Sequence, residues 1–506
     1  MNLTMQRVLP LPLGAVALAL FDIAHTRALE GTAAATLPAD TLMARAGEAT
    51  ARLALAIAPH AQQFWIAAGP GNNGGDGLEA ACHLQRWGKV VRVTLVGDAA
   101  LLPADASAAL ARAQAAGVSI GSTIPDQPER PGLAIDALLG IGASRAPQGA
   151  IAAAIAYLNS LNCPVLAVDV PSGLNAETGQ ALGADCVNAT HTLTMLGLKP
   201  GLFTGAGRDH AGEVWLETLD VDHARDGVAA QAWLSGVPLP VQRRHAQHKG
   251  SFGDVAVVGG GPGMGGAVLL ASRAANAAGA GRVFVEFLGG ASIGCDTLTP
   301  ELMLRPAWSA SAPSVLGAST VVCGCGGGEA VRAPLTRLLS LAKRLVLDAD
   351  ALNAIARDTA LAAMLQARAG RGFATVLTPH PLEAARLLGS TTAQVQADRL
   401  HACQAIAQRY RAIVVLKGSG SVIAGVGRAP HINSTGNAAL ATAGTGDVLA
   451  GWLGGRWSQR QADVVDEIDT AFEAAIQAVA EHGAAAEPPP PGSLRASALI
   501  ERLASR

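Results

Sequence analysis

The chain alternates between short runs of β-branched and other apolar residues and longer stretches rich in alanine and leucine. The short runs predict buried strands, and the longer stretches predict the helices between them. Strands that alternate with helices form a parallel sheet with helices on both faces. In the first half the predicted strands are 64–68, 90–96, 133–138, 165–170, 192–195 and 214–217. In the second half they are 255–258, 282–287, 320–323, 344–347, 374–377 and 412–416.

One segment between the two sets of strands breaks the alternation. Residues 222–249 are rich in Gly, Pro, Gln and His and have no periodic apolar face, which predicts a connection. We therefore expect two α/β domains, residues 1–229 and 230–506, the first a Rossmann-like parallel-sheet sandwich. The proline run at 487–492 predicts a surface loop between two late helices.

Composition narrows the class of protein. The chain has 37 Lys and Arg against 39 Asp and Glu, a net charge of -2, which argues against binding to nucleic acid or an anionic membrane. Half of it is hydrophobic (50%), 15% is charged, and its 59 glycines and 27 prolines are too few for a disordered chain. A compact soluble enzyme is the class that remains.

The cysteines and the first residues bear on the cellular compartment. Seven cysteines without a repeated spacing predict reduced thiols in a cytoplasmic protein. The apolar run 8–21 behind Arg7 is the alternative signal, since it has features of an export sequence. Its cationic flank is thin and it is shorter than a membrane span, so we expect a cytoplasmic location.

Both halves match the spacing G-x-G-x-x-G directly after a predicted strand. The matches are Gly69, Gly71 and Gly74, and Gly261, Gly263 and Gly266. An acidic residue follows about 20 positions later in each half, as in dinucleotide-binding folds. The spacing is weak in a glycine-rich chain, because any tight turn between a buried strand and a helix favours glycine for packing. A tandem Rossmann oxidoreductase stays an alternative.

Oxygen-bearing side chains follow three predicted strands of the first half. The first loop reads GPGNNGGDG, with Asn72, Asn73 and Asp76 in a predicted tight turn, where they suit a cation or a sugar hydroxyl. The alternative is that they only cap a helix that begins at Gly77. DALLGIGASRAP starts at Asp136, and VDVPSGLNAETG contains Asp169 and Ser172. If the strands are neighbours, their ends form one oxygen-rich cluster where open parallel sheets bind ligands; separately, each Asp is a common turn residue.

With DIAHTRALE near residue 22 and LGLKPGLFTGAG near residue 197, these motifs resemble the YjeF-type NAD(P)H-hydrate epimerase over roughly residues 20–222. The resemblance implies a potassium ion held by Asn73, Asp136 and Ser172, and Asp169 as the acid/base at the reacting ring. It also implies that the substrate is lined by Asn72, Asn73, Gly74, Gly75, Asp76, Gly140, Ile141, Gly142, Ala143, Ser144, Arg145, Ala146 and Asp169.

The second half carries a glycine segment suited to phosphoryl transfer. In ATAGTGDVLAG, Gly444, Thr445, Gly446 and Asp447 open an apolar helix, whose N-terminal amides would face an anion. Asp447 could then take the proton of a hydroxyl that accepts the phosphoryl group. The alternative is that Asp447 only stabilises the helix as an N-terminal charge.

Two further positions in this half can be interpreted either as functional residues or as residues with a purely structural role. Lys417 follows a predicted strand, and the Gly-Ser-Gly-Ser after it suits a second phosphate-facing turn. Its alternative is a solvated lysine. His380, between two prolines, is either a ligand contact or a buried structural histidine.

Four segments of the second half, HKGSFGDVAVVGGGPGMGG, LDADALN, LTPHPLEAARLLG and ATAGTGDVLAG, resemble the ADP-dependent NAD(P)H-hydrate dehydratase, a ribokinase-like family, over roughly residues 236–506. The resemblance implies a ribokinase-like α/β sandwich with Asp447 as the catalytic residue. Contacts to the hydrate would come from Ala267, Gly326, His380 and Asp447, and contacts to the nucleotide from Lys417, Gly418, Ser419, Gly420, Ser421 and Gly446. Cys325 stands where this family usually has proline, which loosens the turn at Gly326.

The order of the two halves matches the fused repair enzymes, which are both isomerases and lyases. The resemblance implies epimerisation of the R and S hydrates of NADH and NADPH (NADHX and NADPHX) with K+ in the first domain. It implies ADP-dependent dehydration of the S hydrate to NAD(P)H, AMP and phosphate in the second, with Mg2+. We expect a homo-oligomer with no nucleic-acid or membrane partner. Two rivals stay open: the tandem oxidoreductase, and a non-catalytic binding module fused to a ribokinase-type kinase.

Overall fold

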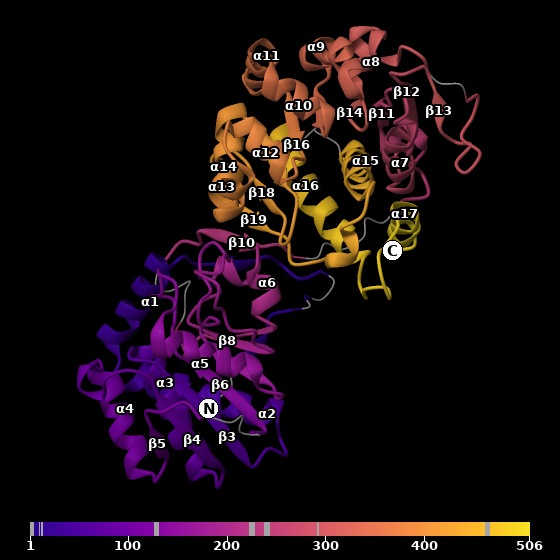
Figure 1. The fold of residues 1–506 in the computed structure, drawn as a ribbon. Helices are drawn as coiled ribbons and strands as arrows, with labels where there is room; N and C mark the ends of the chain where they lie inside the picture. The colour runs from indigo at the N-terminus through magenta and orange to yellow at the C-terminus, as the bar shows by residue number, and fades with distance from the viewer. Residues whose placement is uncertain are drawn as a thin grey trace. The chain divides into compact units, whose positions relative to one another are not determined.

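The computed structural model describes residues 5–9, 11, 14–125, 131–221, 228–236, 243–290, 293–460 and 466–506. The chain divides into two compact units (Figure 1). Unit 1 comprises Met1–Pro10 and Ala19–Ala232, and unit 2 comprises Leu11–Leu18 and Trp233–Arg506. The boundary expected between residues 229 and 230 stays a prediction, and part of the segment 222–249 lies outside the described residues.

Unit 1 is built on an eight-stranded sheet in the order β1-β9-β8-β7-β6-β3-β4-β5. β1 pairs antiparallel with β9, and the other pairs are parallel. The strands are β1 (Gln6–Arg7), β3 (Gln63–Ala68), β4 (Val90–Leu95), β5 (Ser119–Gly121), β6 (Leu133–Ala137), β7 (Val165–Val168), β8 (His191–Met195) and β9 (Glu213–Glu217). The helices are α1 (Ile23–Thr36), α2 (Thr41–Ile57), α3 (Asn72–Arg86), α4 (Ala104–Ala115), α5 (Gly149–Ser160) and α6 (Gly207–His210).

The sheet of unit 1 is buried on both faces because successive strand residues point to opposite sides. Phe64 and Ile66 belong to a core that includes residues of α1 to α4. Trp65 and Ala67 belong to a second core with α5. β3, β6 and β7 are adjacent, so the three strand ends expected to gather do so.

The second sheet, whose strands from β11 to β19 lie in unit 2, has eleven strands in the order β13-β12-β11-β14-β15-β16-β17-β18-β19-β10-β2. The pairs from β13 to β17 are parallel, and β18 is antiparallel to both of its neighbours. The strands are β2 (Leu18–Leu20), β10 (Ala232–Leu234), β11 (Asp254–Gly259), β12 (Arg282–Phe287), β13 (Met303–Leu304), β14 (Thr320–Cys323), β15 (Arg344–Leu347), β16 (Ala374–Leu377), β17 (Ile413–Leu416), β18 (Val422–Ala424) and β19 (His431–Ile432).

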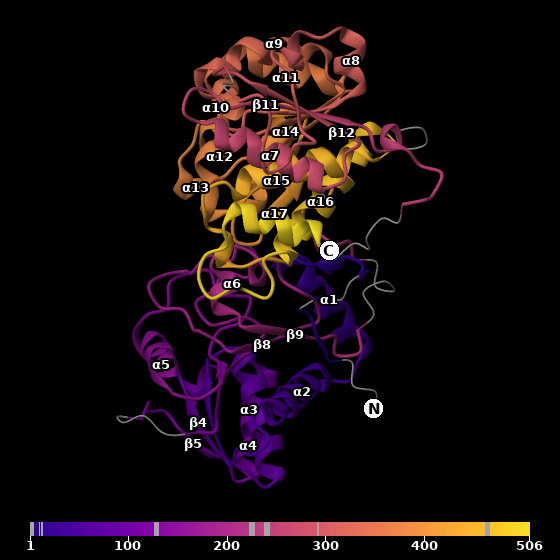
Figure 2. The same cartoon turned by 90° about the vertical axis from the view of Figure 1, so that its right-hand side faces the viewer.

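Helices cover both faces of this sheet as well. Val255 and Val257 face α7, α15, α16 and α17, whereas Ala256 and Val258 face the layer from α8 to α14. Figure 2 shows α7, α15 and α17 on one side of β11 and β12, and α8, α9 and α11 on the other. The helices are α7 (Gly265–Ala277), α8 (Pro313–Ala318), α9 (Arg332–Leu341), α10 (Asp350–Arg357), α11 (Thr359–Ala369), α12 (Pro381–Leu388), α13 (Thr392–Ala397), α14 (Arg399–Tyr410), α15 (Thr445–Ser458), α16 (Glu467–Ala484) and α17 (Ala496–Ala504).

The predicted strands are confirmed, each within a residue or two of its expected bounds. The short edge strands β5 and β13 were not predicted, because two or three residues are too few to show a period. The proline run lies between α16 and α17, as expected. All seven cysteines are free thiols. No helix in the described parts of the chain is long and apolar enough to cross a membrane.

The first glycine loop differs from the prediction. Asn72, Asn73 and Asp76 do not lie in a tight turn ahead of a helix that starts at Gly77, because α3 already begins at Asn72 with Gly71 as its N-cap. Packing explains the glycines: a Cβ on Gly69 would lie 1.8 Å from the carbonyl oxygen of Leu138, and no side chain fits there. The helix therefore starts early because its first turn packs directly on the neighbouring strand end.

Candidate active sites

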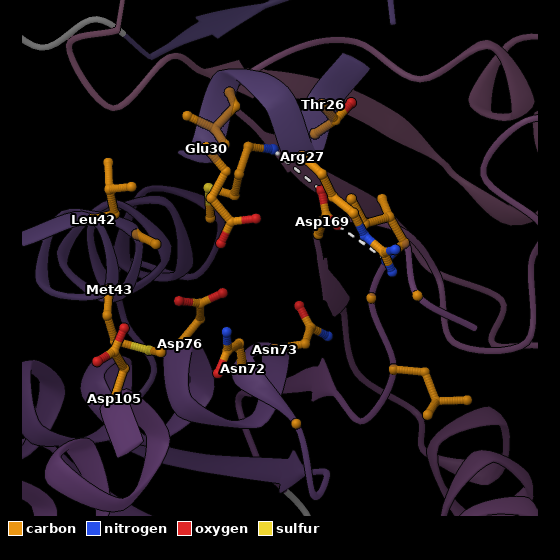
Figure 3. A pocket seen from close by; sticks show the side chains of 18 of the residues that line it. Thr26, Arg27, Glu30, Leu42, Met43, Asn72, Asn73, Asp76, Asp105 and Asp169 are labelled. Carbon is orange, nitrogen blue, oxygen red and sulfur yellow. Dashed lines mark hydrogen bonds between the residues drawn. The ribbon is translucent and has the colours of Figure 1, made fainter. Parts of the chain in front are cut away.

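Unit 1 holds a cavity of about 570 Å³ beyond the carboxyl ends of β3, β6, β7 and β8. Figure 3 shows Glu30, Asn73, Asp76 and Asp169 around this space. The predicted residues that line it are Asn72, Asn73, Asp76, Gly140, Ile141, Gly142, Ala143 and Asp169. Gly74 and Gly75 are buried inside α3, and Ser144, Arg145 and Ala146 continue the loop as partly or fully exposed residues outside the lining.

Asp169 is held in the cavity wall by a buried ion pair. It follows β7 with a φ of 68°, a left-handed conformation that aspartate adopts more readily than most residues. Its Oδ1 lies 2.5 Å from Nζ of Lys199, whose side chain is 1% exposed. Lys199 also donates to Thr194 Oγ1 (3.0 Å) and to the carbonyl oxygen of Met195 (2.7 Å). The lysine thus has its three donors satisfied and fixes one oxygen of Asp169, while the other accepts from the amide of Ile141 at 3.3 Å.

Asp136 and Ser172 lie beneath the loop that closes the cavity. Both side chains are fully buried, and Ser172 donates to Asp136 through its hydroxyl (2.6 Å) and its amide (2.8 Å). Burial raises the pKa of Asp136 to about 6, although these hydrogen bonds lower it. Asn73 approaches the same loop, since a Cβ on Gly140 would lie 3.4 Å from Asn73 Cγ. The Nδ2 atom of Asn73 is buried and has no hydrogen-bond partner among the residues that the structure describes.

This arrangement fits a cation. Among the described residues, Asp136 meets only neutral donors, and a buried carboxylate without a counter-charge is unfavourable. The amide of Asn73 has the same shape when its oxygen and nitrogen exchange places, so it can present a carbonyl oxygen instead of an unsatisfied donor. Carboxylate, hydroxyl and amide oxygens are ligands that hard cations prefer.

Carboxylates dominate the charge of the cavity. Burial raises the pKa of Asp76 well above its ordinary value, and the charges of Asp169, Glu30 and Glu79 add to the effect. Burial and then Asp169 raise the pKa of Glu30 as well. The cavity therefore favours protonated carboxyl groups, which can donate hydrogen bonds.

Unit 2 gathers a second set of charged side chains at strand ends. Cys325 follows β14, Asp348 follows β15, Lys417 follows β17, and Asp447 lies in the first turn of α15. The sulfur of Cys325 and carboxylate oxygens of Asp348 and Asp447 lie within 4.8 Å of one another. Asp348 Oδ1 accepts from Lys417 Nζ (2.8 Å) and from the hydroxyl of Thr378 (2.9 Å).

The environment of Asp447 suits a general base. Burial raises its pKa to about 6, with a further contribution from the charge of Asp348. A hydrogen bond with Cys325 and the charge of Lys417 act in the opposite direction. Burial and the two carboxylates raise the pKa of Cys325 well above its usual value, so the thiol stays protonated and donates to Asp447. A base with a pKa slightly below neutrality is ionised at neutral pH and still binds a proton usefully.

The predicted nucleotide and hydrate contacts cluster around these residues in part. A Cβ on Gly446 would lie 3.3 Å from Lys417 Nζ, and a Cβ on Gly326 would lie 2.9 Å from that of Ala267. Cys325, which we expected to loosen the turn at Gly326, is fully buried, so packing supports the turn at this position. Gly418, Ser419, Gly420 and Ser421 follow Lys417 in one turn, in which Ser421 Oγ donates to the carbonyl oxygen of Gly418 at 3.2 Å.

His380 is neither buried nor a simple surface residue. It is the N-cap of α12, and its Nδ1 accepts from the amide of Leu382 at 3.1 Å. Its Nε2 lies 3.3 Å from Oε1 of Glu383, whose pKa burial raises to about 7. Burial and the charge of Lys417 lower the pKa of His380, so it is a neutral donor or acceptor at neutral pH.

Several residues of both sites were not among the predicted ones. Lys199 lies in the motif LGLKPG and Asp348 in the motif LDADALN, each just beyond a strand. Their position after a strand is the sequence feature from which they could have been predicted. Arg399 gave no such signal: it begins α14, is 1% exposed, and donates to the carbonyl oxygens of Leu416 and Lys417. Through these two hydrogen bonds Arg399 stabilises the turn that follows β17.

Comparisons with known proteins agree with the two-unit organisation. A family model described as YjeF-related protein N-terminus matches residues 39–201, and one described as NAD(P)H-hydrate dehydratase matches residues 255–495. Among solved structures, the ADP/ATP-dependent NAD(P)H-hydrate dehydratase of Bacillus subtilis, co-crystallised with ATP and Mg2+, is 27% identical with a TM-score of 0.41, and the match covers 52% of this chain and 91% of that one. A ribokinase-like superfamily protein of Enterococcus faecalis is 23% identical with a TM-score of 0.42 and covers 52% and 90%.

Full-length relatives extend the likeness across both units. The bifunctional NAD(P)H-hydrate repair enzyme Nnr of Escherichia coli K12 is 37% identical over 464 residues, which covers 88% of this chain and 84% of the relative. The bifunctional NAD(P)H-hydrate repair enzyme of Leishmania major is 35% identical over 526 residues, with coverage of 96% and 92%. Identity at this level over most of both chains establishes common descent, and the protein belongs to the family of bifunctional NAD(P)H-hydrate repair enzymes.

Proposed function

We propose that the protein restores hydrated NADH and NADPH by two activities, in domains of residues 1–229 and 230–506. The first interconverts the R and S hydrates, and the second dehydrates the S hydrate with ADP. The observation that carries this proposal is a pair of strand-end centres, one in each unit. Each combines an Asp with a Lys, which is buried in the first centre and half-buried in the second: Asp169 with Lys199, and Asp447 beside the Asp348–Lys417 pair.

In the dehydratase, the chemistry is phosphoryl transfer followed by elimination. Asp447 takes the proton of the C6 hydroxyl while the hydroxyl oxygen attacks the terminal phosphorus of ADP. The bond between that phosphorus and the oxygen that stays with AMP breaks. The ring-nitrogen lone pair then expels phosphate from C6, and loss of a proton from C5 restores the dihydronicotinamide. Amides at the N-terminus of α15 and Lys417 stabilise the charge on the transferred group. Mg2+ with the nucleotide would neutralise phosphate charge, and the carboxylate of Asp348 is an oxygen ligand that fits it.

In the epimerase, Asp169 gives a proton to the C6 hydroxyl as the ring-nitrogen lone pair breaks the C6–O bond and water leaves. It takes a proton back when water adds to the opposite face of C6. Lys199 holds one carboxylate oxygen, so the other oxygen, beside Ile141, is the one presented to the substrate. The first turn of α3 and the loop at Gly140–Ala146 bind the substrate around it. Asn73, Asp136 and Ser172 would hold potassium, whose charge would offset that of the buried Asp136 carboxylate.

We expect potassium to affect only the epimerase. Replacing it with lithium should slow interconversion of the hydrates, because a smaller ion leaves the oxygens of Asn73, Asp136 and Ser172 too far away to coordinate together. Chromatographic separation of the two epimers over time measures this rate, and ADP-dependent recovery of the S hydrate serves as the internal control. Equal interconversion in both salts would contradict the potassium site.

One assay tests the whole proposal. With both epimers, ADP, Mg2+ and potassium, the purified protein should recover all of the reduced-nicotinamide absorbance and form AMP and phosphate in equal amounts. Without ADP, the epimers should still interconvert and no absorbance should return. Redox turnover without ADP consumption would favour the tandem oxidoreductase. ADP consumption without interconversion would favour a binding module fused to a kinase.

We also propose a cytoplasmic homo-oligomer. Seven free thiols suit a reducing compartment. The near-neutral net charge of -2 is consistent with the absence of a nucleic-acid or membrane partner.

A further inference from the structure

The cavity of unit 1 carries a charge that does not match its proposed substrate. Its charged lining residues are the carboxylates Glu30, Asp76, Asp105 and Asp169 and the cations Arg27 and Lys199. The hydrate of a dinucleotide carries the two negative phosphates of its pyrophosphate. Even with Glu30 and Asp76 protonated, the charges of Asp105 and Asp169 balance those of Arg27 and Lys199, so the lining has no net positive charge to attract the anion.

Lys199 cannot be that partner. Its side chain is 1% exposed, and its ammonium group donates to Asp169, Thr194 and Met195. An ammonium has three donors, and all three are used. Drawing it away would leave the carboxylate of Asp169 buried without its counter-charge.

Arg27 has the opposite character. It lies on α1 with an exposed side chain, and no hydrogen bond or ion pair joins its guanidinium to another described residue. The arginines of α2 and α4 are paired, by contrast: Arg45 with Asp220, Arg52 with Glu48, and Arg112 with Glu79. Arg27 is therefore the lining cation whose hydrogen-bond donors are available to a ligand.

The guanidinium also lies where a phosphate could be shared with backbone. Its Nη2 would be 3.5 Å from a Cβ on Gly142, so the glycine leaves open space directly beside it. Within the described residues, the amide of Gly142 has no hydrogen-bond partner. A guanidinium fork and a free amide on one side of a cavity form a two-point receptor for phosphate oxygens.

We propose that Arg27 binds a phosphate group of the hydrate and thereby makes the epimerase cavity selective for the nucleotide form of its substrate. The inference rests on the proposed epimerase function and adds to it a residue that sets specificity. Arg27 touches the phosphate and takes no part in the proton transfer by Asp169.

The test removes the positive charge of Arg27 from the protein and, separately, the phosphate groups from the substrate. Interconversion of the separated epimers is measured without ADP for wild type and Arg27→Gln. The substrates are the hydrates of NADH, of reduced nicotinamide mononucleotide and of reduced nicotinamide riboside. Arg27→Gln should raise KM for the NADH hydrate roughly 10- to 100-fold with little change in kcat, the scale of a charge-assisted hydrogen bond. For the riboside hydrate, which has no phosphate, the variant and wild type should not differ.

Two further variants complete the design. Arg27→Lys should restore part of the affinity, because an ammonium keeps the charge but not the two-pronged geometry. Arg86→Gln removes an exposed arginine from α3 outside the cavity and should leave KM unchanged for all three substrates.

The outcomes separate the inference from the function beneath it. An unchanged KM for the NADH hydrate in Arg27→Gln, or an equal rise in KM for the riboside hydrate, would overturn the role of Arg27 alone. Absence of interconversion by the wild-type protein would overturn the proposed epimerase and the inference with it.

Discussion

Asp447→Asn is expected to lower ADP-dependent dehydration of the S hydrate by roughly 100-fold or more, the scale of a lost general base. The amide keeps the shape of the carboxyl group and can still accept from Cys325, but it cannot take the proton of the C6 hydroxyl. ADP should still bind, because Lys417 and the amides at the N-terminus of α15 are unchanged. Steady-state recovery of reduced nicotinamide, together with calorimetric titration of ADP, measures both quantities.

The pH dependence gives an independent check on Asp447. Its pKa is about 6, so the fraction of carboxylate falls as pH falls through that value, and the wild-type rate should fall with it. Asp348, Lys417, Cys325 and Asp350 are the ionisable groups that act on Asp447, and Asp447→Asn should remove the acid limb from whatever rate remains.

A control separates catalysis from helix stability. Asp469 occupies the first turn of α16, is 45% exposed and pairs with Arg428 away from the site. Asp469→Asn should lower the free energy of unfolding slightly, by roughly 0.3–1 kcal/mol, and leave dehydration unchanged. If Asp447→Asn behaves in the same way, Asp447 is only a helix charge and the proposed mechanism is wrong.

Replacement of Asp169 should abolish epimerisation and leave dehydration intact. With a mixture of epimers, Asp169→Ala should recover the S hydrate at the wild-type initial rate and then stall, with a slow tail from spontaneous epimerisation. The expected loss of interconversion is about 100-fold or more, because the proton carrier is gone. The time course of reduced-nicotinamide absorbance shows the stall directly.

A second substitution guards against a loss of structure. Asp169→Ala leaves the buried ammonium of Lys199 without its partner, and breaking a buried pair costs about 3–5 kcal/mol. Asp169→Asn keeps an oxygen that accepts from Lys199 and should lose the same activity with a smaller change in thermal stability. If the Asp169→Asn variant clears both epimers at the wild-type rate, unit 1 is a binding module and the two-activity proposal is wrong.

Much of the fold could be predicted because local burial patterns repeat along the chain. A strand such as Val165–Val168, buried on both faces, is apolar throughout, and the helices between strands must be apolar on one side. The strand-end location of Asp136 and Asp169 follows from the same alternation, since parallel strands present their carboxyl ends at one edge. The short strands β18 and β19 escaped prediction because their burial comes from neighbouring strands and not from their own pattern.

By itself, the sequence therefore determined which segments are strands, which residues stand at their ends and which family the motifs resemble. The tertiary structure alone decided which of those residues meet. Lys199 lies 30 positions from Asp169 and Lys417 lies 69 positions from Asp348, and each pair forms only because the strand order brings their loops together. The hydrogen bond of Cys325 to Asp447 and the early start of α3 at Asn72 have the same origin. Hydrophobic periodicity is a local property, whereas the partner of a buried charge depends on the whole path of the chain.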